Sequence, residues 1–457
     1  MDRYDVVIIG AGAGAKLVWT SLAGSGLSVA VIEESLVGGD CPFLACVPSK
    51  AMLRSAQVWR TADDPEWAGL FTGRVPERAA YEETVARRER IVRGRDDTAN
   101  AAGLEKTGAT LIRGTARIVR PGVVDVDGTE IGYGELVLNT GSAPVRPDIP
   151  GLDEVPVWTS DEAMSSTAER PELVVVIGGG PVGCELAFLY ASFGSAVTVV
   201  QRGDRLIPRE EPEASKAMLS LLHDHGVDVR LNTQVVRAEA HPLGGRLTTD
   251  HGDVFDASVV IQAAGRRPRS RKVGLDALGV EPGRGGAIEV DDHCRVVGAE
   301  HVWAVGDVTG VAPFTHTAHY HGRVVAANLA GRDTRADHRA IPRAVYTRPV
   351  LAAVGHTVAS AREAGIEPLT ATAPVTQAVR TSIEGEPEGW LTLLAHPDTG
   401  AVIGATAWGG RAEEWISEVS LAVRAEIPVE VARDVVHPFP TFAEVLETPL
   451  WELAERR

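Results

Sequence analysis

The stretch "YDVVIIGAGAGAKLVWTSLAGSGLSVAVIEE", residues 4–34, decides the fold. It reads as strand, glycine turn, helix and strand, and its apolar runs are too continuous for a sheet with one solvent face. This order is typical of a buried parallel βαβ unit. The same order recurs in "ELVVVIGGGPVGCELAFLYASFGSAVTVVQR", residues 172–202, so the chain contains two such units.

The first glycine turn has the spacing of a dinucleotide fingerprint. Gly10 and Gly12 fill its first two positions and Ala15 its third, with Gly14 just before it. Glycine lets the backbone approach a pyrophosphate, which the amides and dipole of a helix N-terminus then stabilise. Glu33 follows Gly10 by 23 residues, where a carboxylate can accept hydrogen bonds from ribose hydroxyls. The alternative is a turn that only packs a helix on a strand, but the surrounding strands, helix and acid favour a nucleotide.

The second glycine turn fits the same fingerprint through Gly178, Gly180 and Gly183. The residue 23 positions after Gly178 is Gln201 and not an acid. A carboxylate there would repel a 2′-phosphate, whereas Gln201 with neighbouring arginines can tolerate or bind one, so the sequence favours NADPH over NADH. These arginines are Arg202 and Arg205. Alternatively, both are solvated surface charges.

Length and charge limit the remaining possibilities. A chain of 457 residues is too long for one core and suggests about three domains. The 45 basic and 62 acidic residues give a net charge of −17, which disfavours nucleic acid or an anionic membrane as a partner. No apolar run reaches the roughly 18 to 20 residues of a membrane span, and the N-terminus leads almost directly into a strand. We therefore expect a cytoplasmic protein.

The pattern along the chain suggests four segments. A charged helical stretch at about 81–106 and short β-rich segments separate the two units, and a proline cluster at 144–150 leads into the second unit. The stretches "ASVVIQAAGRRP" and "HVWAVGDVTG" are short strands that run into glycine turns, and from about residue 335 strands alternate with amphipathic helices. We predict an α/β fold with two Rossmann-like dinucleotide-binding domains and an α+β C-terminal domain. The expected segments are 1–150 and 263–334 for the first domain, 151–262 for the second, and 335–457 for the third.

Two of the chain's four cysteines lie five positions apart in "GGDCPFLACVPSK", residues 38–50. Four cysteines are too few for a disulfide-stapled secreted scaffold, and a zinc site would need further Cys or His close by. Two buried apolar cysteines would leave the following "PSK" unexplained. We favour a catalytic redox pair for Cys41 and Cys46 and expect no metal site. We interpret Cys184 and Cys294 as structural.

Eight motifs in sequence order resemble those of the pyridine nucleotide-disulfide oxidoreductases. These FAD enzymes include dihydrolipoamide dehydrogenase, glutathione reductase and mercuric reductase, and the resemblance spans the whole chain. It implies a homodimer in which a hydride from NAD(P)H passes through FAD to a Cys41–Cys46 disulfide and on to an acceptor. The motifs are "IGAGAGA", "GGDCPFLACVPSK", "NTGSAP", "IGGGPVGCE", "AAGRRP", "AVGDV", "VYTRPVLAAVG" and "PTFAEVLE".

The resemblance assigns roles within the cysteine stretch. Cys46 is expected beside the flavin, and Cys41 is expected to be the outer thiol that attacks the substrate. A helix beginning near Pro48 would direct its N-terminal dipole at the sulfurs and lower the pKa of a thiolate. Lys50 is expected near flavin N5 with Glu185 as its buried counter-ion, because each charge alone would be costly to bury. Lys50 is alternatively an ordinary surface lysine.

Further contacts with the cofactors are implied by the same resemblance. Asp307 of "AVGDV" would hold the FAD ribitol hydroxyls, although it is alternatively a turn aspartate. His316 lies where family members place backbone amides near the flavin ring, so its side chain is less informative. The other expected contacts, from the glycine-rich motifs, are Gly39, Thr140, Gly141, Ser142, Gly265 and Gly306.

Three positions depart from the family pattern. Pro181 stands where many relatives have a tyrosine that covers the nicotinamide pocket, so access to that pocket would be ungated. Asp40 replaces the usual threonine, and its charge would raise the pKa of Cys41 unless something offsets it. In "HPFPTFAE", Phe439 stands at the position of the histidine that protonates the leaving thiol from the partner subunit.

His437 lies two residues before Phe439, and in an extended, proline-bounded segment such positions point the same way. It could act as the acid, with or without Glu444, or it could be structural, and both alternatives stay open. Mercuric reductases also lack the histidine, but they have a C-terminal cysteine pair that the ending "LWELAERR" lacks.

The sequence thus predicts an NAD(P)H-dependent flavoenzyme with a small-molecule acceptor. The acceptor could be a disulfide, a quinone, a metal ion or a specialised small molecule, and the last three need no protonated leaving thiol. A dihydrolipoamide dehydrogenase-type enzyme is an alternative that Gln201 and Phe439 disfavour. Another alternative is a non-catalytic sensor that binds FAD and a dinucleotide, against which the cysteine pair, Lys50 and Glu185 argue.

Overall fold

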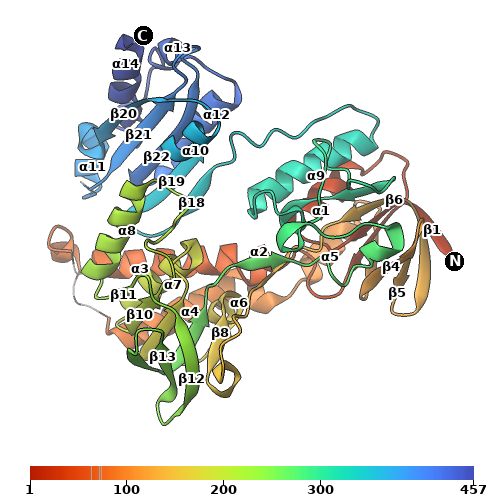
Figure 1. Cartoon of the computed structure of the whole chain (residues 1–457), viewed down its shortest axis with the longest axis horizontal. Helices are drawn as coiled ribbons and strands as arrows, with labels where there is room; N and C mark the ends of the chain where they lie inside the picture. The colour runs from red at the N-terminus through yellow and green to blue at the C-terminus, as the bar shows by residue number, and fades with distance from the viewer. Residues whose placement is uncertain (63, 72, 74, 387, 457) are drawn as a thin grey trace.

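The computed structural model describes residues 1–457 except 63, 72, 74, 387 and 457. Figure 1 shows the first nucleotide unit in red to orange together with green to teal, the second in yellow to green, and the C-terminal domain in blue. The two ends of the chain lie far apart in this view, the N-terminus at the first unit and the C-terminus at the blue domain.

The first nucleotide unit is built on a seven-stranded sheet. Its elements are β1 (Asp2–Ile9), α1 (Ala13–Ser21), β2 (Val29–Glu33), α2 (Asp40–Phe43), α3 (Cys46–Thr61), α4 (Glu77–Ile91), α5 (Thr98–Glu105), β3 (Thr110–Arg113), β4 (Ala116–Arg120), β5 (Val123–Val126), β6 (Thr129–Leu138), β17 (Val302–Ala304) and α9 (Thr315–Leu329). The strand order is β3-β2-β1-β6-β5-β4, and β17 pairs parallel with the end of β6. Strand β2 is buried along its whole length, as its continuous apolar run predicted.

The second nucleotide unit has an all-parallel sheet of order β11-β10-β9-β15-β8. Its elements are β8 (Val157–Thr159), α6 (Ser160–Ser165), β9 (Leu173–Ile177), α7 (Pro181–Ser192), β10 (Ala196–Val200), α8 (Pro212–Asp224), β11 (Asp228–Arg230) and β15 (Val259–Gln262). An antiparallel sheet is inserted before the last strand and consists of β12 (Val235–His241), β13 (Gly244–Thr249) and β14 (Val254–Ala257).

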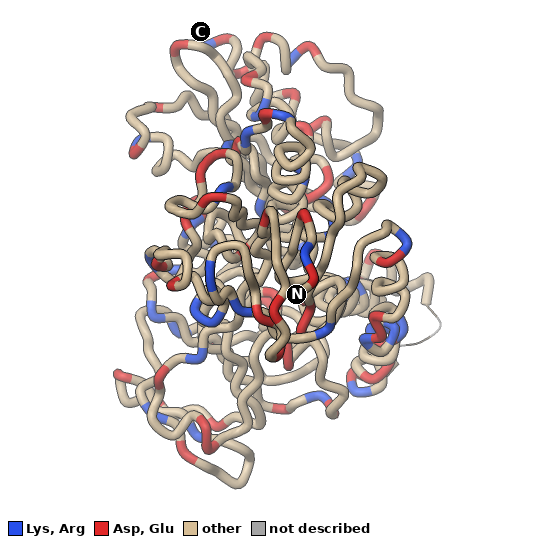
Figure 2. Tube along the Cα trace, turned by 90° about the vertical axis from the view of Figure 1, so that its right-hand side faces the viewer, with Lys and Arg blue, Asp and Glu red and all other residues tan. Residues whose placement is uncertain are grey.

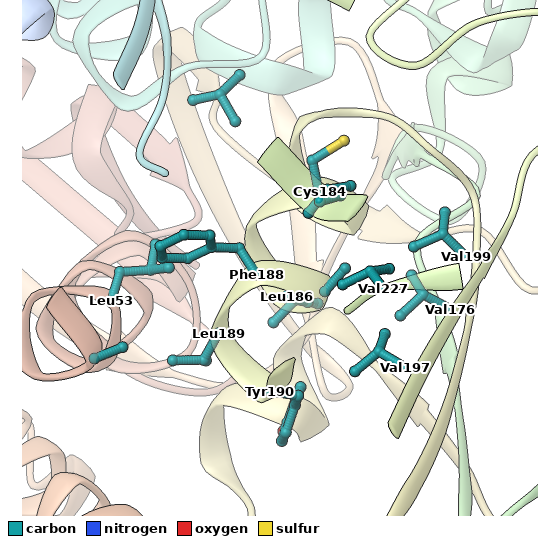
Figure 3. Close-up of a cluster of buried hydrophobic side chains, with 14 of the residues drawn as sticks. Leu53, Val176, Cys184, Leu186, Phe188, Leu189, Tyr190, Val197, Val199 and Val227 are labelled. Carbon is teal, nitrogen blue, oxygen red and sulfur yellow. The ribbon is translucent and has the colours of Figure 1, made fainter. Parts of the chain in front are cut away.

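Helix α7 joins the two units through a shared core. Most of its side chains are buried, so it needs partners on several sides. Figure 3 shows Leu53 of α3 beside Phe188 and Leu189, while Val176 and Val197 of the sheet lie on the other side of α7. The helix that begins at Cys46 is thereby packed into the core of the second unit.

The chain crosses between the two units twice, and the crossing segments pair with each other. β7 (Ser142–Pro144) and β16 (Arg266–Pro268) form an antiparallel two-stranded sheet, which we call the connecting ribbon. Arg266 pairs with Pro144, and Pro268 pairs with Ser142.

The C-terminal domain has an antiparallel sheet of order β18-β19-β22-β21-β20. Its elements are β18 (Arg343–Val345), β19 (Val350–Gly355), α10 (Val358–Glu363), β20 (Leu369–Pro374), α11 (Val379–Ile383), β21 (Trp390–Ala395), β22 (Val402–Gly409), α12 (Ala412–Arg424), α13 (Val429–Ala432), the 3-10 helix η8 (Phe442–Leu446) and α14 (Glu447–Glu455). Trp415 and Ile416 of α12 are buried in its core beside Ala407 of β22.

These sheets confirm the predicted fold class of two Rossmann-like domains and an α+β C-terminal domain. The strands of each sheet come from the expected segments, and the boundaries at 150, 262 and 334 stay a prediction. Acidic and basic positions are interspersed over the trace in Figure 2. Among the described residues no helix has both the length and the apolarity that a membrane crossing requires.

Candidate active site

The first glycine turn is shaped by contacts that only glycine permits. Gly10 has a φ of +92°, and a Cβ there would collide with the carbonyl oxygen of Asn139. The Asn139 side chain donates a hydrogen bond from Nδ2 to the Gly10 carbonyl at 3.1 Å. A Cβ on Gly39, which has a φ of +72°, would lie 2.9 Å from the Cα of Gly12. The turn and the cysteine stretch therefore meet backbone to backbone, and Asn139 braces them.

Other fingerprint residues face protein atoms. A Cβ on Gly14 would lie 2.9 Å from Cγ2 of Val305, and Ala15 is fully buried. Both residues therefore allow α1 to pack closely against neighbouring elements.

Glu33 and Gln201 occupy equivalent places in the two units. The Glu33 carboxylate accepts hydrogen bonds from the amides of Ala11 at 2.6 Å and Ser35 at 2.7 Å, and burial raises its pKa. Gln201 Oε1 accepts one from the amide of Gly179 at 2.9 Å, while its Nε2 donates to the Arg205 carbonyl at 3.3 Å. Each side chain thus braces its own glycine turn, with a carboxylate in the first unit and a neutral amide in the second.

The second glycine turn leaves its backbone open. Gly178 has a φ of +116°, and a Cβ on Gly183 would collide with the Gly178 carbonyl. By contrast, a Cβ on Gly180 would meet no atom within 4 Å. Pro181 starts α7, where its missing N–H costs nothing. Of the two expected arginines, Arg202 is exposed. Arg205 donates a hydrogen bond to the Pro208 carbonyl at 2.5 Å.

The residues present fit two dinucleotides. Space is also open beside Gly141 and Gly265, because a Cβ on either residue would meet no atom within 4 Å. Thr140 Oγ1 donates a hydrogen bond to the carbonyl of Arg269 at 2.7 Å, so the loop before β7 is bound to the residue that follows β16 of the connecting ribbon. Open glycine backbone at Gly180, the N-cap of α7, suits a pyrophosphate at that helix N-terminus, whereas the crowded glycines before α1 allow only close backbone approach there.

The two candidate redox thiols lie near the N-termini of two consecutive helices, a short one and a long one. Cys41 is in α2, and Cys46 is the first residue of α3, two positions before the expected start near Pro48. Both are partly buried free thiols. Cys46 Sγ lies 3.2 Å from Oγ1 of Thr315, the first residue of α9. Thr315 was missed in the sequence, where only its neighbour His316 in "FTHTAHY" drew attention.

The negative charge of the thiol pair is located on Cys46. A hydrogen bond from Cys41 lowers the pKa of Cys46 to about 6 against the effect of burial, with further help from Thr315 and Lys50. The same hydrogen bond raises the pKa of Cys41, and burial adds to this. When both thiols are reduced, the lower pKa of Cys46 favours the thiolate there and leaves Cys41 protonated. Cys184 and Cys294 are fully buried, which raises the pKa of both.

Lys50 and Glu185 form an ion pair between α3 and α7. Lys50 Nζ lies 2.8 and 3.1 Å from the two carboxylate oxygens and 4.7 Å from the centre of the Tyr346 ring. The Tyr346 amide donates to Glu185 at 2.9 Å. Burial lowers the pKa of Lys50, but Glu185 together with Cys46 and Tyr346 outweighs burial, so the pKa is raised. Lys50 and Tyr346 also line a cavity of about 560 Å³ between α3 and the C-terminal domain.

Asp307 and Asp40 are linked through Ser142 and through Arg266, which sequence reasoning did not single out. Asp307 accepts a hydrogen bond from Ser142 Oγ at 2.6 Å, and Ser142 in turn accepts one from Arg266 at 2.9 Å. Arg266 also pairs with Asp40 at 2.9 Å. Arg266 thus offsets the charge of Asp40, and the raised pKa of Cys41 comes mainly from Cys46 and from burial. The adjacent Gly306 has a φ of +73° and receives contacts from α9.

His316 lies at the exposed start of α9. Its ring stacks on Phe314, with centroids 5.1 Å apart and planes at 9°, and its Nε2 lies 2.9 Å from the Pro342 carbonyl. The side chain therefore packs on the segment that leads to the C-terminal domain.

The expected acid and its partner are not brought together. His437 is almost completely buried at its side chain and lies between Glu418 at 3.1 Å and Glu447 at 3.2 Å. Glu444 instead accepts a hydrogen bond from the Thr441 amide at 3.0 Å and caps η8. Phe439 is 72% exposed.

Comparison with known proteins agrees with this geometry. The model of the family described as pyridine nucleotide-disulphide oxidoreductase matches residues 4–322, and that of its dimerisation domain matches residues 341–450. A mercuric reductase of Streptomyces lividans is 33% identical over 97% of this chain and 95% of its own length. A dihydrolipoyl dehydrogenase of Chlamydia muridarum is 30% identical over the same shares.

A solved structure shows the same fold over nearly the whole chain. It is the Cu(II) complex of the HOCl-induced flavoprotein disulfide reductase RclA from Escherichia coli, with a TM-score of 0.87 and 28% identity. The match covers 99% of this chain and 100% of that one. The chain therefore belongs to the pyridine nucleotide-disulphide oxidoreductases, flavin-dependent oxidoreductases that use FAD and NAD(P)H.

Proposed function

We propose that this protein is an NAD(P)H-dependent flavoenzyme that reduces a Cys41–Cys46 disulfide and passes the electrons to a small-molecule acceptor. The observation that carries the proposal is the reduced thiol pair, with its thiolate on Cys46 at the N-terminus of α3 and beside Thr315. When bound, FAD would take a hydride from NAD(P)H and supply an electron pair to the cysteines.

The chain's own residues would bind and orient the cofactors. The turn from Gly10 to Gly14, the 140–142 loop and Asp307 would hold FAD, and the turn from Gly178 to Gly183 would hold NAD(P)H. The Lys50–Glu185 pair would keep a positive charge near Cys46, because Glu185 helps to keep the partly buried lysine protonated.

NADPH is the preferred nucleotide in this proposal. Gln201 adds no negative charge at the ribose, and Arg202 is exposed beside it. Replacing Gln201 with Glu is expected to shift the ratio of kcat/KM values toward NADH by about 10-fold or more, because a carboxylate repels the 2′-phosphate. An unchanged ratio would argue against this preference.

The acceptor side favours an acceptor that needs no acid from the protein. His437 is held by two carboxylates of its own domain, and Phe439 occupies the usual acid position. When two thiols become a disulfide, they release two electrons and two protons. The two electrons can reduce two Cu(II) ions to Cu(I), and this reduction needs no proton on a leaving group. Soft metal ions also prefer thiolate ligands. Similarity to mercuric reductases and to RclA, solved with Cu(II), supports a metal ion as the acceptor.

An anaerobic titration with NADPH and with NADH tests the proposal. We expect a long-wavelength thiolate-to-flavin absorption band, whereas an unchanged oxidised flavin spectrum would favour a non-catalytic sensor. An acceptor screen should then include Cu(II), Hg(II), a quinone, glutathione disulfide and lipoamide. Turnover with Cu(II) or Hg(II) above that with the disulfides is the expected result. Efficient dihydrolipoamide oxidation with NAD⁺ would favour the dihydrolipoamide dehydrogenase alternative instead.

A further inference from the structure

Arg266 connects three separate parts of the chain through one guanidinium group. It lies on the connecting ribbon, where the chain returns from the second nucleotide unit. Its Nη2 lies 2.9 Å from Oδ2 of Asp40, and its Nη1 lies 3.0 Å from Oδ1 of Asp161. Its Nε donates to Ser142 Oγ at 2.9 Å. The cysteine stretch, the second unit and the first unit therefore meet at this side chain.

The cluster is partly buried, so solvent screens its charges only in part. The side chains of Arg266, Asp40 and Asp161 are 23%, 29% and 17% exposed. Burial raises the pKa of Asp40, and the positive charges of Arg269 and Arg266 oppose this effect. Without Arg266, the carboxylates of Asp40 and Asp161 would both lose the cation with which they form ion pairs.

We propose that Arg266 is a positioning residue that holds the Asp40 carboxylate, and with it helix α2, in the arrangement that the outer thiol Cys41 requires. The inference rests on the proposed function, in which Cys41 attacks the acceptor. It concerns a feature of this chain, because Asp40 stands where the family pattern has a threonine.

The physical consequence is a change in the ionisation of Cys41. Asp40 immediately precedes Cys41 on α2, and an uncompensated carboxylate there disfavours a neighbouring thiolate. The groups with the largest effect on the pKa of Cys41 are Cys46 and Lys50 on α3 and Thr315 on α9, so the effect of Asp40 is expected to be smaller than theirs. Loss of the Arg266 charge should therefore raise the pKa of Cys41, and loss of the Asp40 charge should lower it.

The test isolates one redox thiol in the FAD-loaded protein. In a Cys46→Ser background, alkylation of Cys41 by iodoacetamide is followed by mass spectrometry as a function of pH, while the other two cysteines are buried. Arg266→Gln should raise the midpoint of the curve of Cys41 alkylation against pH by about 0.5 to 1 pH unit. Arg267→Gln removes the same charge from the exposed neighbour on β16 and should leave the midpoint unchanged. Arg266→Lys keeps the positive charge, so its alkylation midpoint should stay close to that of the Cys46→Ser parent.

A double variant separates charge coupling from loss of structure. Asp40→Asn should lower the midpoint, and Arg266→Gln should add little in that background, because the two changes act through one ion pair. Equal midpoints for Arg266→Gln, Arg267→Gln and the parent would overturn the proposal. If Arg266→Gln fails to retain FAD, the Asp40→Asn variant decides, since an unchanged midpoint there also overturns it.

The same samples distinguish this inference from the proposed function. Absence of the long-wavelength band in wild-type protein treated with NADPH would contradict the proposed function. The alkylation midpoints report on the ion pair alone and need no acceptor.

Discussion

The two cysteines have different surroundings, although they are five residues apart. Cys46 lies at the start of α3, contacts Thr315 and is close to the Lys50–Glu185 pair. Cys41 lies beside Asp40, whose charge is taken up by Arg266. Lys50 and Glu185 near Cys46 thus belong to the shared family motifs, whereas Asp40 beside Cys41 departs from the family pattern. The difference shows that the surroundings of two neighbouring thiols can vary independently of each other.

The largest expected effect comes from removing one sulfur at a time. Cys46→Ser should abolish the long-wavelength band, because the thiolate beside the flavin is lost. Cys41→Ser should retain or strengthen the band in the oxidised enzyme, because Cys46 can no longer be locked in a disulfide. Visible absorption spectra with and without NADPH give the measurement. The opposite pattern would reverse the roles of the two cysteines.

Breaking the ion pair should have the next largest effect. Glu185→Gln leaves Lys50 partly buried without its counter-ion, which is expected to slow flavin reduction by NADPH about 10- to 100-fold. Stopped-flow absorbance of the flavin measures this rate. Lys50→Arg keeps the positive charge, so the rate of flavin reduction should fall less than in Glu185→Gln. Equal rates for Glu185→Gln and wild type would restrict the pair to a packing role.

The pH dependence of the thiolate should follow Cys46. Because its pKa is lowered to about 6, the long-wavelength band should be present above this pH and should be lost as pH falls through about 6. Thr315→Val removes a hydrogen-bond donor to the thiolate and should move the midpoint upward by about 0.5 to 1 pH unit. Thr315→Ser should stay near wild type. A downward shift in Thr315→Val would contradict the assigned contact.

The smallest effect is expected at His437. Its ring nitrogens contact Glu418 and Glu447 within its own domain, so His437→Ala should change turnover with Cu(II) by less than about 2-fold. The free energy of unfolding should fall by about 1 kcal/mol, measured by urea denaturation, because hydrogen bonds are lost. A loss of about 100-fold in turnover with a disulfide acceptor, with flavin reduction intact, would instead identify His437 as the acid.

Much of the site could be predicted because its residues belong to short motifs with fixed spacing. The two glycine turns, the cysteine pair and the partnership of Lys50 with Glu185, 135 positions away, all follow from such motifs. Arg266 lies within "AAGRRP", which was interpreted as a strand end and a glycine turn, and Thr315 lies beside His316, which alone was considered there. Nothing local indicated that Arg266 would reach Asp40, 226 positions earlier in the chain.

The sequence by itself determined the backbone of the two nucleotide units, because turns, strands and helix starts depend on residues within a few positions of each other. Only the tertiary structure decided which charges meet. Asp40 is neutralised because the connecting ribbon brings Arg266 to it, and His437 lies away from Glu444 because α12 and α14 present other carboxylates. Ion pairs of this kind depend on how distant elements pack, which no spacing along the chain specifies.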